Sequence, residues 1–125
     1  MINNVILVGR IVEEPVLRKF DREVVGAFIT LAVTRPFKNI EDKYDTDFIK
    51  CSLWEGMAEN TCAFCKKGDV IGVRGRLVTR QNEVMIDEEE KVSKKYYSVE
   101  VIVERVAFIC SSKKYENQTS EVNNI

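Results

Sequence analysis

Aromatic rings and basic side chains alternate in one segment of this 125-residue chain, and together they could bind flat, negatively charged ligands. Phe48 and Trp54 are six residues apart, with Lys50 between them. An even separation puts side chains on one face of a β-strand, here opposite a face of isoleucine, cysteine and leucine. Rings stack on nucleobases, and Lys or Arg neutralises phosphate, so this face suits an exposed nucleic-acid strand. The alternative is that both rings belong to the core or to a subunit contact.

The pair Cys62 and Cys65 has the spacing of a redox or metal motif. The chain has four cysteines and no histidine, so a zinc site would need all four thiols to converge. A redox pair lies at the start of a helix, where the dipole favours thiolate, whereas this pair falls in the later half of a predicted helix. We interpret both thiols as small buried apolar groups. A thiol oxidoreductase is the rival from the enzyme class.

No catalytic set, metal site or cofactor motif is predicted. The absence of histidine removes the commonest general base, and there is no Gly-x-x-x-x-Gly-Lys phosphate loop.

The formal net charge is −1, but between Thr61 and Arg80 there are five basic residues and only one acidic residue, so this net charge is compatible with a basic groove. No apolar run reaches the roughly 20 residues of a membrane span. Four cysteines without an export signal favour the cytoplasm.

Strand patterns dominate the elements that must position these residues. Five strands are predicted, over Val5–Val12, Val25–Arg35 (ended by Pro36), Asp47–Trp54, Val70–Leu77 and Tyr96–Ile109. Gly72 and Gly75, inside the fourth, indicate bends or close backbone approach.

A single helix is predicted between the third and fourth strands. It spans Gly56–Lys67, with Gly68 as its C-cap and two lysines at its negative end. This order predicts an all-β fold with one short helix, namely a five-stranded OB-fold Greek-key barrel. We expect one domain, residues 1–110, and a flexible polar tail, residues 111–125.

Several strings in this order resemble the bacterial and phage-type single-stranded DNA-binding proteins (SSB family). They run from residue 2 to about 109 and are Asn4–Arg10, Pro15–Arg18, Phe28–Val33, Asp47–Cys51 with Trp54, Ala58–Asn60, Lys67–Gly68 and Gly75–Arg80. The resemblance implies an OB-fold, a homotetramer (or a homodimer) and binding of single-stranded DNA without strict sequence preference. It also implies roles in DNA replication, recombination and repair.

The resemblance extends to individual site residues. It implies stacking of bases on Phe37, Phe48 and Trp54, and phosphate contacts from Arg18, Arg35, Lys50, Lys67 and Arg80. Many family members carry another ring shortly after the matching Thr-Arg, where this chain has Gln81-Asn82-Glu83. Either this chain has one stacking ring fewer than those members, or Tyr96 or Tyr97, across the hairpin, replaces that ring.

Two further features bear on partners. The apolar first strand, Ile2–Val8, is expected to mediate oligomerisation, because it would otherwise leave an adhesive edge. Many members recruit replication and repair proteins through an acidic tip ending in Pro-Phe, which the given sequence does not contain: either the chain is truncated or it is a short form. Replication and repair proteins remain candidate partners, but the sequence does not predict recruitment through such a tip. The acidic run Asp87–Glu90 and the neutral net charge favour a rival function, an OB-fold module for RNA or protein contact.

Overall fold

The computed structural model describes residues 1–20 and 22–112. Its elements, in chain order, are β1 (Val5–Ile11), β2 (Arg18–Lys19), β3 (Val25–Lys38), β4 (Tyr44–Trp54), α1 (Glu55–Phe64), β5 (Val70–Asp87) and β6 (Val92–Cys110). Among these residues there is no helix long and apolar enough to cross a membrane. From residue 113 on, the expected tail lies outside the described residues.

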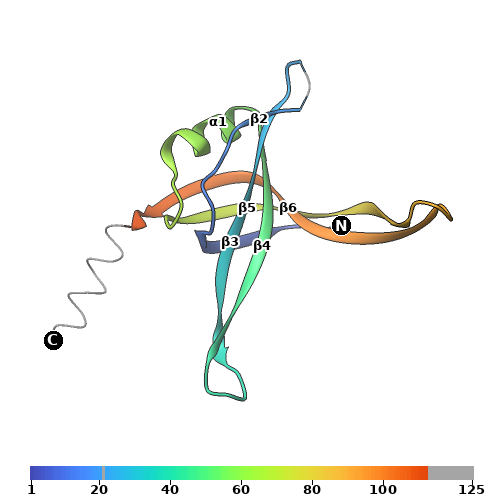
Figure 1. Ribbon diagram of the computed structural model, residues 1–125. Coiled ribbons are helices and arrows are strands. Elements are labelled where there is room, and N and C mark those ends of the chain that lie inside the picture. Colours follow the sequence, from blue (N-terminus) through green and yellow to red (C-terminus); the bar gives the residue numbers. More distant parts are fainter. Residues whose placement is uncertain (21, 113–125) are drawn as a thin grey trace.

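The strands form a closed barrel. Their order is β1-β5-β6-β4-β3-β2, and pairing of β1 with β3 at Arg10↔Ala32 and Ile11↔Leu31 closes it. All ladders are antiparallel except the short one between β4 and β6. Long hairpins project from the barrel on the β3–β4 and β5–β6 sides (Figure 1). The predicted five-stranded barrel is confirmed, and the two-residue β2 is an unpredicted addition beside β3.

Alternate side chains of the strands fill the barrel. Twelve buried apolar residues make this core: Ile11, Ala27, Ile29, Leu31, Cys51, Leu53, Ala58, Cys65, Ile71, Val73, Val101 and Val103. Five of them, Ala27, Ile29 and Leu31 on β3 and Cys51 and Leu53 on β4, follow the period of two that was predicted for the second and third strands. The opposite, outward-facing residues of the same strands are therefore available for binding.

The prediction that Pro36 ends the second strand is wrong. β3 continues to Lys38, and the β3–β4 register shifts between Thr34 and Lys38. A proline removes a ladder hydrogen bond, and an irregular stretch of this kind is where a strand tolerates it. The β5–β6 hairpin is also longer than predicted, because its ladder continues from Val70↔Cys110 out to Asp87↔Val92.

The helix between β4 and β5 is confirmed, but its predicted end is wrong. α1 ends at Phe64, and Cys65 leaves it in an extended conformation. The reason is local: Asp69 Oδ2 accepts a hydrogen bond of 2.8 Å from the Lys66 amide, which holds that residue in the following turn. Gly68, with φ of 91°, belongs to this turn and is not the C-cap.

Candidate nucleic-acid interface

Three aromatic rings form a cluster on the outer surface of the barrel. The centroids of Phe20 and Phe28 are 5.5 Å apart with an interplanar angle of 90°, and those of Phe28 and Trp54 are 6.0 Å apart at 85°. Phe20 and Trp54 are 5.2 Å apart and tilted. Edge-to-face packing fixes ring orientation, and Phe28 is still 43% exposed. The cluster is therefore a preorganised surface on which a base could stack.

Strand register brings the cluster together. Gly26 lies opposite Trp54, and Phe28 lies opposite Ser52, in the β3–β4 ladder. Directly opposite residues point to the same face of a sheet, so the Phe28 and Trp54 rings meet. Phe20 follows β2 and joins them through the turn in which its amide donates to the Val24 carbonyl at 2.9 Å.

The predicted alternation of β4 is confirmed with one exception. Cys51 and Leu53 are fully buried, whereas Lys50 is exposed and the Phe48 ring is 65% exposed. Ser52 was expected on the exposed face but is buried, because Phe28 is its cross-strand neighbour and β6 pairs along its other side.

A groove of about 400 Å³ lies beside the ring cluster. Its lining residues come from the loop after β1 and from β3, β4, β5 and β6: Glu13, Phe28, Ile29, Thr30, Lys50, Arg80, Asn82, Tyr96, Ser98 and Glu100. Two of the predicted phosphate ligands, Lys50 and Arg80, thus come together there. The Arg80 guanidinium forms an ion pair with the buried carboxylate of Glu100.

The groove also distinguishes the two tyrosines proposed to replace the missing ring. Tyr96 lies opposite Asn82 in the β5–β6 ladder, and both line the groove. Tyr97 lies opposite Gln81 and therefore faces the other way. The hairpin register thus favours Tyr96 over Tyr97 as the ring that would replace the missing one.

Arg35 is engaged by carboxylates on its own hairpin. Its Nε and Nη2 donate to the two carboxylate oxygens of Asp47 at 3.0 and 2.9 Å, and Asp45 Oδ2 lies 3.8 Å from Nη1. The hydrogen bonds and charge of this pair raise the pKa of Arg35 and lower the pKa of Asp47. A phosphate would have to compete with two carboxylates for this guanidinium.

The other predicted residues are spread over the surface. Arg18 lies opposite Gly26, next to the ring cluster. Phe37 is 78% exposed on the β3–β4 hairpin, beyond the barrel. Lys67 follows α1, and its amide donates to Glu14 at 3.1 Å. The structure therefore separates Phe37 and Lys67 from the groove.

Sequence reasoning did not select Phe20 and Phe28 as site residues. Phe28 could have been found, because its even spacing from Thr30 and Ala32 puts it on the face of the strand opposite Ile29 and Leu31, the same kind of spacing that identified Phe48 and Trp54. Phe20 gave no periodic signal, since it lies in a turn. Only the pairing of β2 with β3 brings it to the cluster.

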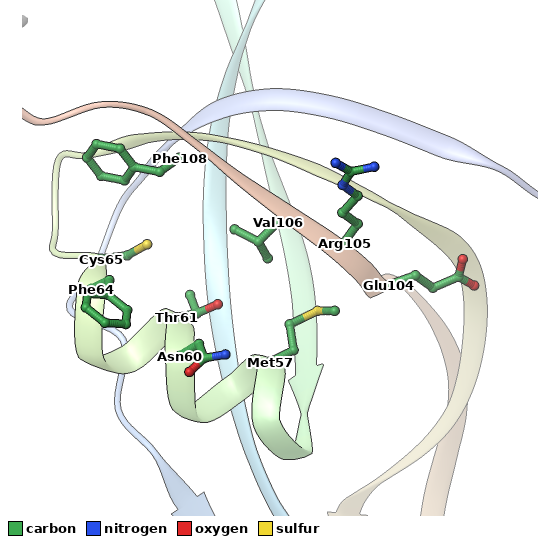
Figure 2. Close-up of a pocket in the computed structure, with 9 residues that line it drawn as sticks. All are labelled: Met57, Asn60, Thr61, Phe64, Cys65, Glu104, Arg105, Val106 and Phe108. Atoms are coloured by element: carbon green, nitrogen blue, oxygen red, sulfur yellow. The ribbon is translucent and has the colours of Figure 1, made fainter.

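A different hollow, of about 450 Å³, lies between α1 and β6 (Figure 2). Met57, Phe64, Val106 and Phe108 give it an apolar lining, and none of the predicted binding residues contributes to it. Cys65 also lines it, and burial raises the pKa of both Cys62 and Cys65. Raised pKa values favour protonated thiols, which is the reverse of what thiol–disulfide chemistry requires.

A closed β-barrel with outward rings beside basic side chains defines an OB-fold of the nucleic-acid-binding class. Comparison with known proteins makes this assignment specific. The model of the Single-strand binding protein family matches residues 2–109, and the chain belongs to that family.

Named relatives support the assignment. Single-stranded DNA-binding protein 3 of Listeria innocua is 40% identical over 124 residues, covering 99% of this chain and 74% of that protein. Single-stranded DNA-binding protein B of Bacillus subtilis is 41% identical over 109 residues, or 87% of this chain and 91% of the relative. Single-stranded DNA-binding protein 1 of Lactococcus lactis is 41% identical over 122 residues, or 97% of this chain and 77% of the relative.

Proposed function

We propose that this protein coats single-stranded DNA during replication, recombination and repair in the cytoplasm, by base stacking and phosphate contacts. The observation that carries the proposal is the ring cluster of Phe20, Phe28 and Trp54, which adjoins a groove bordered by Lys50. Phe48 extends the stacking surface along β4. Stacking tolerates any base, so the binding needs no strict sequence.

The phosphate contacts are assigned by position. Lys50 and Arg18 border the rings, and Arg80 contributes through the groove. Lys67, Phe37 and Arg35 are proposed as outer contacts of a strand that continues past the barrel. Arg35 has to exchange its carboxylate partners for phosphate.

A fluorescence titration with oligo(dT), at low and then high salt, tests this function. Trp54 is the only tryptophan, so quenching reports on the cluster itself. We expect strong quenching that requires more DNA at high salt, because bound phosphates release counterions. Unchanged emission together with no complex in a gel-shift control would refute the proposal.

A second candidate, an RNA- or protein-binding module, is favoured by the carboxylates near the predicted cations. Glu13 and Glu100 line the groove, and Asp45 and Asp47 engage Arg35. Competition of oligo(dT) against oligo(U) discriminates between the two. Tighter binding of the RNA would support the second candidate.

We further propose that the protein assembles as a homotetramer, or a homodimer, through the outer face of β1. Ile6, Val8 and Ile109 are at least half exposed and line a shallow apolar hollow with Ala107. Sedimentation of the wild type and of Val8→Asp tests this. We expect the variant to dissociate, and a wild type that sediments as a monomer would overturn the proposal.

A further inference from the structure

Two arginines lie directly opposite each other on the outer face of the sheet that β1, β5 and β6 form. Arg74 on β5 is in register with Arg105 on β6, and Ile6 on β1 lies opposite Arg74 on its other side. Directly opposite residues point to the same side of a sheet, so both guanidinium groups belong to this face. Figure 2 shows the Arg105 side chain pointing away from α1.

Neither of these two positive charges is neutralised by the protein. In the part of the chain that the structure describes, the side chains of Arg74 and Arg105 form no ion pair and no hydrogen bond. The carboxylate next along β6, that of Glu104, lies 3.8 Å from Arg76 instead. Like charges directly opposite each other destabilise a sheet. A bound anion would relieve this repulsion.

The two arginines border the hollow through which we propose that copies of the chain assemble. The hollow measures about 310 Å³, and its other described lining residues are all apolar or glycine: Ile6, Leu7, Val8, Gly72, Val73, Ala107 and Ile109. In a twofold contact each copy presents the same surface to the other, so both would bring an unneutralised arginine pair to the contact. Burial of the apolar residues favours such a contact, whereas the charges oppose it.

We propose that Arg74 and Arg105 form a binding site for a multivalent oxyanion such as inorganic phosphate, and that the bound anion promotes packing of two copies through this face. Guanidinium groups bind oxyanions through charge-assisted, often bidentate hydrogen bonds. The inference rests on the proposed assembly and adds a ligand to it. Phosphate should therefore strengthen assembly, although salt weakens the binding of DNA.

Sedimentation equilibrium of the DNA-free wild type tests the inference, in sodium phosphate and in sodium chloride at equal ionic strength and pH. We expect the dissociation constant of the assembly to be lower in phosphate by about threefold or more, because like-charge pairs of both copies are relieved. Equal constants, or complete assembly in chloride at the lowest protein concentration, would overturn the inference and leave the proposed assembly standing. A monomer in both salts would refute the assembly itself.

Arg105→Gln tests the site, because it keeps a long polar side chain and removes one of the paired charges. We expect this variant to assemble equally well in the two salts. The matched control is Lys94→Gln, which removes the same charge from β6 in the projecting hairpin, opposite Val84, and should keep the phosphate effect. Phosphate also strengthens apolar contacts in general, so an effect that persists in Arg105→Gln would refute the site. Arg74→Gln provides the same test if Arg105→Gln does not fold.

Discussion

Gly26 lies directly opposite Trp54, so close that a Cβ on Gly26 would be 2.6 Å from Trp54 Cε3. The indole ring therefore lies over the backbone of β3, in space that only glycine leaves open. From there it contacts Phe20 and Phe28. Because Gly26 on β3 has no side chain, the Trp54 ring of the neighbouring strand β4 can lie in the position where it contacts the other two rings.

Gly26→Ala should displace the Trp54 ring. We expect a lower free energy of unfolding, by about 1–3 kcal/mol, a red-shifted emission maximum and weaker binding of oligo(dT). The control is Gly56→Ala in α1, where an added Cβ meets nothing within 4 Å. That change should stabilise the helix and leave emission unaltered. Identical emission from the two variants would contradict the packing argument.

Phe28→Ala should weaken DNA binding by removing a stacking surface. Base–aromatic stacking contributes about 1–3 kcal/mol per base, so a loss of about fivefold or more in affinity is expected. Titration with oligo(dT) measures it, after circular dichroism has shown that the variant folds. Phe64→Ala, at a ring 77% exposed on α1 and away from the groove, should bind like the wild type.

Asp47→Asn should release Arg35 for phosphate. We expect tighter binding of single-stranded DNA and a salt dependence steeper by about 0.7 in log–log slope for each phosphate gained. The control Asp42→Asn removes the same charge from the partner of Lys38 at the tip of the hairpin. If both variants raise affinity equally, general electrostatics and not Arg35 is responsible.

Alkaline pH should destabilise the fold through Cys51. Burial, with a smaller effect from the Glu100 charge, raises the pKa of this thiol from an ordinary 9.0 to about 12. Because the folded-state pKa is raised, the contribution of this thiol to the free energy of unfolding is complete below pH 9.0, and it is lost as the pH rises toward about 12. Urea unfolding across this range should show a shallower decline for Cys51→Ala than for the wild type.

Gly75→Ala should be strongly destabilising. A Cβ at this position would lie 2.0 Å from the Ile102 carbonyl oxygen, where the β5–β6 register shifts. Overpacking against backbone should reduce the free energy of unfolding by about 1–3 kcal/mol or more, as thermal melting would show. Gly72→Ala is the matched control on the same strand, because its nearest contact, at 3.5 Å, is ordinary. Equal melting temperatures would contradict the close approach.

The sequence by itself was sufficient to predict the barrel, the family and the rings on β4. Strand periodicity assigned Phe48, Lys50 and Trp54 to one face, because side chains alternate along any strand. The close approach predicted from the interior glycines is confirmed at Gly75. Local patterns predicted the ends of elements less well. α1 ends earlier than predicted, where Asp69 accepts a hydrogen bond from the Lys66 amide, and β3 continues past the predicted end through an irregular part of its ladder with β4.

Only the tertiary structure decided which of those residues share a site. Phe20 and Trp54 are far apart in sequence, and the ladders of β2, β3 and β4 join them. The same packing pairs Arg80 with Glu100 and Arg35 with Asp47. The alternation of side chains between two faces is a property of a single strand, so a short stretch of sequence predicts it. Strand register and ion pairs depend on which strands pair with each other, and no short stretch of sequence determines that pairing.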